Sequence, residues 1–177
     1  YQVFLAVFVS AAITCLLMPP FIRLMKHEHL GQQVRADGPQ RHLIKQGTPT
    51  MGGVVILLGI VLTCALLAKW TPDLVLALVA MLVTGSLGLL DDIESVAHKR
   101  SLGLTPPQKM AGLTVICVAF CLVAVNLLGV SPVVTIPFAN IDIDLGIAAF
   151  TVGGVYVPWL YVFFVFILMA GMSNAVN

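Results

Sequence analysis

Two adjacent acids, Asp91 and Asp92, follow an apolar run that is long enough to cross a membrane as a helix. The C-terminal end of a helix carries partial negative charge, so a carboxylate there costs about 0.3–1 kcal/mol. Mg²⁺ would offset this cost, because it binds carboxylates together with substrate phosphates. The alternative is an interfacial pair that is solvated or neutralised by nearby basic residues. Neighbouring helix positions point about 100° apart, so both acids converge on one site only if the helix ends there.

A second segment, Lys45-Gln46-Gly47-Thr48-Pro49-Thr50-Met51-Gly52-Gly53, leads into another apolar run. The N-terminus of a helix offers unpaired N–H groups and a positive dipole end, which favour a phosphate or another anion. Lys45 would add a mobile positive charge, and the two glycines would let a ligand approach the backbone. The alternative is a Pro/Thr turn whose glycines pack against a neighbouring helix.

Two further segments carry polar groups near predicted helix ends. Thr105-Pro106-Pro107-Gln108 has the spacing of a capping box with proline at the first helical position, and Lys109 follows it. Asn174 and Asn177 are three residues apart and share a helix face, where two amides could bind a sugar, a base or a phosphate. A simple helix start and a helix C-cap are the alternatives. The histidines are expected to be solvated; they are His27, His29, His42 and His98.

These segments need a framework, and the composition predicts that it lies in a membrane. Of the 177 residues, 59% are hydrophobic and only 10% are charged, and the mean hydropathy is +1.04. Soluble domains carry about 25% charged residues, so a soluble globular domain is excluded, as is disorder. Five apolar runs are long enough to span a bilayer, which predicts an all-α polytopic membrane protein with one integral-membrane domain over residues 1–177. The runs cover approximately residues 3–22, 51–68, 74–90, 110–128 and 155–172.

The basic residues predict the orientation. Eight of the nine Lys and Arg residues lie in segments 23–50 and 91–109, and the ninth is Lys69. The positive-inside rule places these two segments in the cytoplasm and the N-terminus outside. The candidate residues for chemistry then face the cytosol. The segment 129–154 would lie outside, and its alternating Ile141-Asp142-Ile143-Asp144 predicts a small exterior β-hairpin whose acids are solvated.

Taken in order along the chain, these segments resemble one family. Gly47-Thr-Pro-Thr-Met-Gly-Gly53, Asp91-Asp92, Gly103-Leu104 with Lys109, and Asn174-Ala-Val-Asn177 are similar to the motifs of phospho-N-acetylmuramoyl-pentapeptide transferase. This family lies within the polyprenyl-phosphate sugar-1-phosphate transferase superfamily. The resemblance covers the whole chain. It implies transfer of phospho-MurNAc-pentapeptide from UDP-MurNAc-pentapeptide to undecaprenyl phosphate, with Mg²⁺ as cofactor and release of UMP.

The resemblance also implies residue roles. Asp91 and Asp92 would orient or deprotonate the lipid phosphate or hold Mg²⁺, with the division of roles left open. Lys45, Thr48, Thr50 and Lys109 would line the phosphate path, and Asn174 and Asn177 would lie near the nucleotide sugar. The implied location is the bacterial plasma (inner) membrane, with a homodimer as a family expectation and no nucleic-acid partner.

The family has about ten spans and a further metal-binding Asp after the last motif. The chain is therefore expected to be the N-terminal half and to be inactive by itself. A related transferase for a different UDP-N-acetylhexosamine is the nearest alternative. A transporter or a noncatalytic scaffold is the other. A transporter is less favoured, because no acidic or basic residue lies at mid-depth in the five runs.

Overall fold

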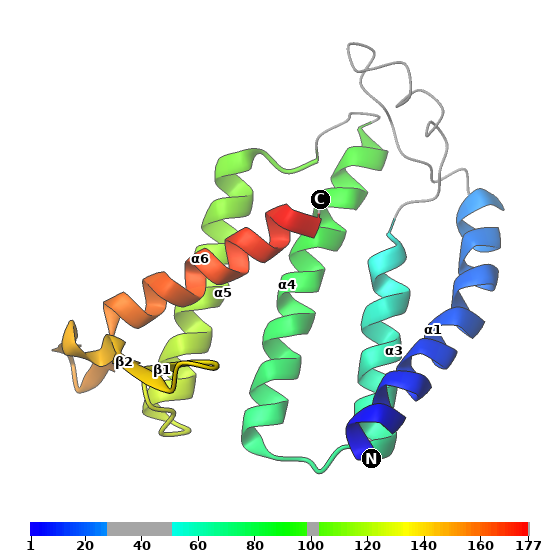
Figure 1. The fold of residues 1–177 in the computed structure, drawn as a ribbon. Helices are drawn as coiled ribbons and strands as arrows, with labels where there is room; N and C mark the ends of the chain where they lie inside the picture. The colour runs from blue at the N-terminus through cyan, green and yellow to red at the C-terminus, as the bar shows by residue number, and fades with distance from the viewer. Residues whose placement is uncertain (28–50, 99–102, 177) are drawn as a thin grey trace. The chain divides into compact units, whose positions relative to one another are not determined.

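The computed structural model describes residues 1–27, 51–98 and 103–176, and within these ranges it is largely helical. Its five helices are α1 (Gln2–His27), α3 (Gly52–Leu67), α4 (Pro72–Ala97), α5 (Pro106–Asn126) and α6 (Trp159–Val176) (Figure 1). Three of them, α1, α4 and α5, are long and apolar enough to cross a membrane, and α3 and α6 contain shorter apolar helices. The predicted class, a polytopic α-helical membrane protein, is confirmed.

The helices follow the five predicted apolar runs, with two informative differences. The third run was expected to end at residue 90, but α4 continues to Ala97. The fifth was expected to begin at residue 155, but α6 begins at Trp159, because residues 155–157 pair with another strand. At the end of α4, polar residues continue the helix beyond the apolar run. Before α6, β-branched residues form a strand in place of the first turn of the expected helix.

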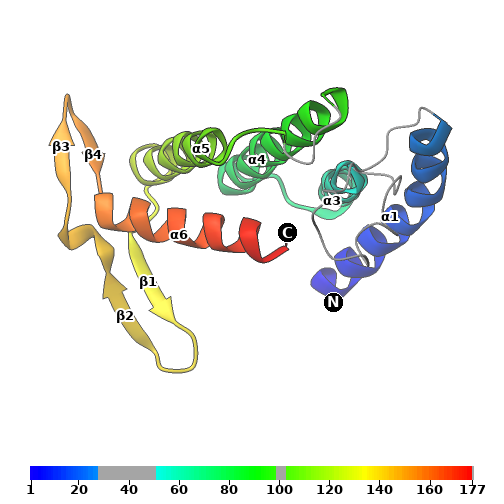
Figure 2. The same cartoon turned by 90° about the horizontal axis from the view of Figure 1, so that it is seen from above.

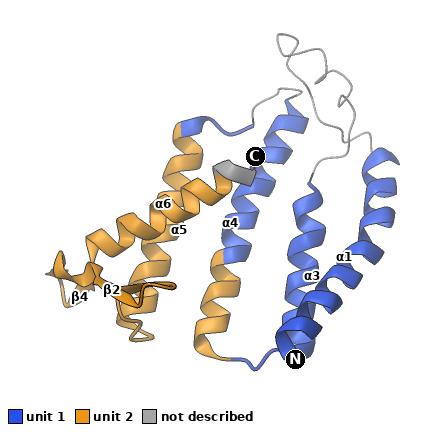
Figure 3. Ribbon diagram, viewed as in Figure 1, with its two compact units in different colours: residues 1–70, 81–106 blue, residues 71–80, 107–177 orange. Residues whose placement is uncertain are grey.

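The chain divides into two compact units, coloured separately in Figure 3: residues 1–70 with 81–106, and residues 71–80 with 107–177. In the first unit, α3 packs against α1 through its buried face, which carries Val55, Gly59 and Thr63. A Cβ on Gly59 would lie 2.5 Å from Oγ1 of Thr14, so the absence of a side chain lets the two helices approach closely. The Thr63 hydroxyl donates to the Gly59 carbonyl at 2.7 Å and is thereby satisfied inside the helix.

The opposite face of α3 contacts α4. A Cβ on Gly85 of α4 would overlap the side chain of Leu57, which is two residues from Gly59 and therefore on the other side of α3. Figure 1 shows that α3 begins and α4 ends at the same end of the first unit. The first unit thus places the helix that begins at Gly52 beside the helix that carries the two acids.

In the second unit, α5 buries an apolar face with Leu113, Cys117, Cys121 and Ala124. The Cys117 thiol lies 3.5 Å from the carbonyl oxygen of Val162 on α6. All four cysteines are free. Cys117 and Cys121 are buried, as the apolar setting predicts, whereas Cys15 is exposed on α1, where an apolar membrane environment makes burial in protein unnecessary.

The hairpin predicted in segment 129–154 is present. Strand β1 (Val133–Ile136) pairs antiparallel with β2 (Ile141–Asp144), with Val133 opposite Asp144 and Ile136 opposite Ile141. A short 3-10 turn, η1 (Leu145–Ile147), follows. Asp142 and Asp144 lie in a strand whose residues are all exposed, as predicted.

A second hairpin joins the first to α6. Strands β3 (Phe150–Val152) and β4 (Val155–Val157) turn at Gly153-Gly154, where both glycines have positive φ. Figure 2 shows both hairpins at the N-terminal end of α6. The side-chain amide of Asn126, at the end of α5, exchanges two 2.9 Å hydrogen bonds with the backbone N–H and C=O of Tyr156. Asn126 therefore ties the second hairpin to α5.

Candidate functional site

The acidic pair lies within α4 and not at its C-terminus, which corrects the position expected from the apolar run. Asp91 and Asp92 precede the helix end at Ala97 by more than one turn, and both are half-buried. The helix continues because Glu94 and His98 extend its last turn, with His98 Nδ1 2.9 Å from Oε2 of Glu94. The two carboxylates therefore leave the helix in different directions, separated by about 100°.

The Asp91 carboxylate connects α4 to the segment that leads into α5. The backbone N–H of Leu104 donates a hydrogen bond of 2.7 Å to its Oδ1 atom. A hydrogen bond to an ionised acceptor is among the stronger polar interactions in proteins. This bond spans thirteen residues of sequence and is partly buried, so it fixes Asp91 relative to the loop.

Gly103 lies directly against the same acid. A Cβ at this position would overlap the backbone carbonyl oxygen of Asp91 and would lie 2.8 Å from its Oδ1 atom. Only glycine allows this approach. The backbone of Gly103-Leu104 therefore lies directly against Asp91.

Asp92 lies on another side of α4. It follows Gly85 by seven residues, which is two helical turns, and Gly85 is the residue that contacts Leu57 of α3. Asp92 therefore lies on the face of α4 that is directed toward α3. Because α3 begins where α4 ends, this face is directed toward the first turn of α3 (Figure 1).

The N-terminus of α3 has the features of an anion site. Its cap, Met51, has a left-handed conformation with φ 65° and makes no side-chain capping hydrogen bond. Among the residues that the structure describes, no atom would lie within 4 Å of a Cβ on Gly52 or Gly53. The N–H groups of a first helical turn favour an anion. The predicted phosphate-path residues Lys45, Thr48 and Thr50 lie outside the described residues.

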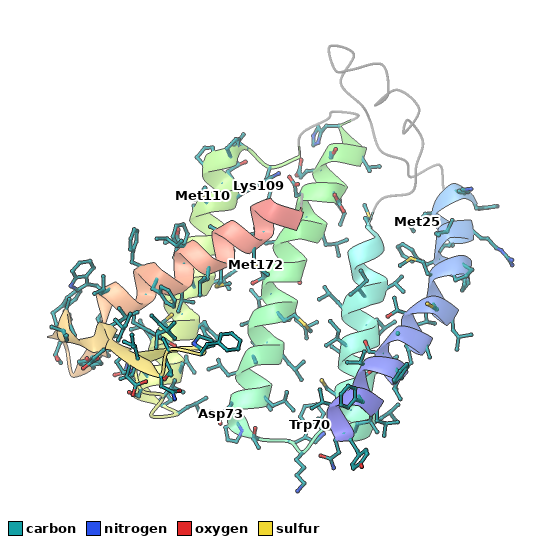
Figure 4. The ribbon with its side chains drawn as sticks, viewed as in Figure 1. Met25, Trp70, Asp73, Lys109, Met110 and Met172 are labelled. Atoms are coloured by element: carbon teal, nitrogen blue, oxygen red, sulfur yellow. The ribbon has the colours of Figure 1, made fainter. Side chains whose placement is uncertain are left out.

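The remaining predicted residues belong to the second unit. Helix α5 begins at Pro106, as the capping-box pattern predicts, and Lys109 lies in its first turn (Figure 4). Asn174 lies in the last turn of α6, and Asn177 is outside the described residues. Each unit is defined by itself, so the assignment of Lys109 and Asn174 to a site with Asp91 stays a prediction.

The carboxylates fit a magnesium ion that a substrate helps to bind. Among the residues that the structure describes, no group of three or more His, Cys, Asp or Glu could hold a metal by itself. Mg²⁺ is commonly bound by one or two carboxylates and the phosphates of a substrate, and keeps several waters. Asp91 and Asp92 are both half-buried, but their side chains leave α4 about 100° apart, so one of the two would supply a carboxylate and the substrate phosphates would complete the ligand set.

Sequence reasoning did not predict the link between Asp91 and the Gly103-Leu104 segment. The sequence contained a signal, since a glycine two residues before the Thr105-Pro106 helix start is compatible with a close backbone approach. The partner of that approach was not visible, because it depends on how the loop folds back on α4.

The described fold and site define an integral membrane protein that presents an acidic pair and a helix N-terminus at one end of a helical unit. Residues 45–57 match the family model named phospho-N-acetylmuramoyl-pentapeptide-transferase signature 1. Over its length the chain is similar to the phospho-N-acetylmuramoyl-pentapeptide-transferases, which confirms the resemblance inferred from the motifs.

Three relatives of that name illustrate the similarity. The protein from Halalkalibacterium halodurans is 38% identical over 177 residues, which cover 98% of this chain and 50% of the relative. The Bacillus subtilis protein is 37% identical over 169 residues, covering 93% and 48%. A Listeria monocytogenes protein is 36% identical over 173 residues, covering 96% and 49%. The chain thus spans about half the length of the curated relatives it matches.

Proposed function

We propose that the full-length protein containing this chain transfers phospho-MurNAc-pentapeptide from UDP-MurNAc-pentapeptide to undecaprenyl phosphate. The observation that carries the proposal is the match to the family signature at residues 45–57, which runs into the first turns of α3. Asp92 lies on the face of α4 that contacts α3 through Gly85, which supports a site shared with the N-terminus of that helix. In this proposal the chain supplies part of the catalytic site, and the rest of the protein completes it.

The reaction is a phosphoryl transfer that conserves one diphosphate linkage. An oxygen of the lipid phosphate forms a bond to the sugar-linked phosphorus of the UDP-sugar. The bond between that phosphorus and the oxygen bridging to UMP breaks, and UMP leaves with the electron pair. Catalysis of such a reaction depends mainly on positioning and on neutralising charge.

The residues of this chain have distinct tasks in that reaction. The N–H groups of the first turn of α3 would bind phosphate oxygens, and Lys45, Thr48 and Thr50 would extend the phosphate path before it. The carboxylates of Asp91 and Asp92 would orient the lipid phosphate and accept its proton where it is monoanionic. Lys109, Asn174 and Asn177 would contact the phosphate and the nucleotide sugar.

Asp91 or Asp92 would also hold Mg²⁺ with the substrate phosphates, since the two side chains leave α4 in different directions. When bound, the ion would neutralise charge that develops on the transferring phosphoryl group. We further propose that the acidic end of α4 faces the cytosol of a bacterium and that the N-terminus lies outside, as the Lys and Arg distribution indicates. A homodimer remains part of the proposal on family grounds alone.

A transferase for another UDP-N-acetylhexosamine is the second candidate, because an acidic pair with a glycine pair would serve either donor. The two candidates separate when UMP release by the full-length protein in undecaprenyl phosphate micelles is measured with each donor. We expect turnover with UDP-MurNAc-pentapeptide and none with UDP-N-acetylglucosamine. The reverse preference would favour the second candidate, and no turnover with either donor would favour a noncatalytic scaffold.

A further inference from the structure

Helix α4 and the segment before α5 contact each other at Asp91. Two independent contacts lie there: the Leu104 N–H donates to Oδ1 at 2.7 Å, and the backbone of Gly103 lies against the main-chain carbonyl of the same residue. Neither contact uses a side chain of the loop. Both contacts are therefore made by the backbone of Gly103 and Leu104.

The two contacts depend on each other. A Cβ on Gly103 would overlap the Asp91 carbonyl oxygen and would lie 2.7 Å from its carbonyl carbon. Both atoms belong to the backbone of a helix, so they cannot rotate away as the end of a long side chain would. The loop would have to withdraw, and the adjacent Leu104 N–H would leave the carboxylate.

We propose that Gly103 is a positioning residue of the transferase, which sets the orientation of the Asp91 carboxylate by bringing the Leu104 N–H to its Oδ1 atom. This inference rests on the proposed function of Asp91 and deepens it. The hydrogen bond fixes the position of Oδ1, and the position of Oδ2 follows because the carboxylate is rigid and planar. A displacement of about 1 Å in a reacting group can cost about 100-fold in rate, so the contact need not touch substrate to control turnover.

The contact itself is tested first, without any assay of activity. Hydrogen–deuterium exchange of the Leu104 amide is measured in the full-length protein. Pro106 and Pro107 have no amide hydrogen, so few exchangeable sites surround Leu104 in a short peptide. We expect faster exchange at Leu104 in Gly103→Ala and in Asp91→Ala. Asp91→Asn keeps an oxygen acceptor and should keep more of the protection.

Gly171→Ala is the matched control. Gly171 lies in α6, and a Cβ there would meet no atom within 4 Å, so the same change adds the same methyl group without a clash. Unchanged exchange at Leu104 in this variant is expected. Wild-type exchange at Leu104 in both Gly103→Ala and Asp91→Ala would overturn the proposal, even if one of the two variants folds poorly.

The consequence for turnover is tested by steady-state kinetics of UMP release. We expect Gly103→Ala to lower kcat at least about tenfold, with KM for the UDP-sugar changed by less than about twofold. A purely structural role would lower the thermal midpoint and the folded fraction, and leave kcat per folded molecule unchanged. That result would overturn the proposal.

The double variant separates this inference from the function on which it rests. If Gly103 acts through Asp91, adding Gly103→Ala to Asp91→Asn causes no further loss, because the two effects share one mechanism. Full additivity would overturn the positioning role. Normal turnover in Asp91→Asn would instead contradict the proposed function of Asp91, while the exchange data would still decide whether the contact exists.

Discussion

The chain carries two pairs of closely spaced aspartates, and the structure treats them differently. In the first hairpin, Asp142 accepts a 2.6 Å hydrogen bond from the Thr135 hydroxyl of the paired strand, and Asp144 accepts a 2.8 Å bond from the Gly146 N–H. Both residues are exposed. Asp91 and Asp92 are instead half-buried in a long apolar helix, and Asp91 is bonded to a loop thirteen residues away.

The two pairs differ in how much water surrounds them and in where their partners lie. The hairpin acids remain in water, so their desolvation cost is small, and their hydrogen-bond partners lie in the same hairpin or in the turn that follows it. The acids of α4 lose part of their hydration. They therefore require compensation from outside their own helix, which the loop provides for Asp91 and which we propose a metal ion and substrate provide as well.

The largest expected effect is the loss of turnover when either aspartate of α4 is neutralised, compared with the same change in the hairpin aspartates. Asp91→Asn and Asp92→Asn, each made in the full-length protein, should lower kcat/KM for UMP release at least about 100-fold, as expected for loss of a proton-accepting or charge-binding group. Asp142→Asn and Asp144→Asn should stay within about twofold, because substitutions at exposed positions usually have small effects. Equal losses of kcat/KM in the α4 pair and in the hairpin pair would contradict a catalytic role that is specific to the α4 pair.

A smaller effect is expected from the crowded glycine of the hairpin region. A Cβ on Gly146 would lie 2.7 Å from Cγ of Pro132 and 2.9 Å from the Tyr156 hydroxyl. Gly146→Ala should therefore reduce stability by about 1–3 kcal/mol through overpacking, seen as a lower thermal midpoint in detergent. Turnover per folded molecule should not change, in contrast to Gly103→Ala. A selective loss of kcat in Gly146→Ala would make the two glycines equivalent and would contradict the account.

Removing one hydroxyl of the hairpin region should cost less. The Tyr156 hydroxyl donates a 3.0 Å hydrogen bond to the Gly146 carbonyl and is partly buried. Tyr156→Phe removes this donor and keeps the ring, so we expect a loss of about 0.5–1.5 kcal/mol. The thermal midpoint of Tyr156→Phe is measured together with that of Tyr161→Phe, a control at another tyrosine of the same unit. No measurable loss would mean that water replaces the bond.

The smallest effect is expected at the exposed ribbon. Thr135→Val removes the hydroxyl that donates to Asp142 and preserves a β-branched side chain suited to a strand. The change in unfolding free energy should stay within about 0.5 kcal/mol, because the pair is exposed. A loss larger than the one caused by Tyr156→Phe would show that the first hairpin is held more tightly than its exposure suggests.

Much of the fold was predictable from the sequence because membrane helices have a strong composition signal. The apolar runs gave all five described helices, and the alternation around Ile141–Asp144 gave the first hairpin. The second hairpin was missed, although Gly153-Gly154 between β-branched residues is a typical turn signal. The run from residue 155 was interpreted as one continuous span, because Val155–Val157 are as apolar as the helix that follows them.

The candidate site was predictable in residue type and less so in geometry. The acids and the glycine pair were identified from their chemistry and order. The continuation of α4 to Ala97 was not, since the polar residues after Asp92 ended the hydropathy signal although they still form helix. The contact between Gly103 and Asp91 could not be predicted, because it is a tertiary approach between backbones.

The most direct test of the central claim, metal-assisted phosphoryl transfer at the acidic end of α4, is the Mg²⁺ dependence of UMP release. The full-length protein is supplied with UDP-MurNAc-pentapeptide and undecaprenyl phosphate, treated with EDTA, and then given excess Mg²⁺. We predict that UMP release stops on chelation and returns with Mg²⁺ in the wild type, while Asp91→Asn and Asp92→Asn remain inactive under both conditions. Full turnover in EDTA, or normal turnover in both variants, would contradict the claim.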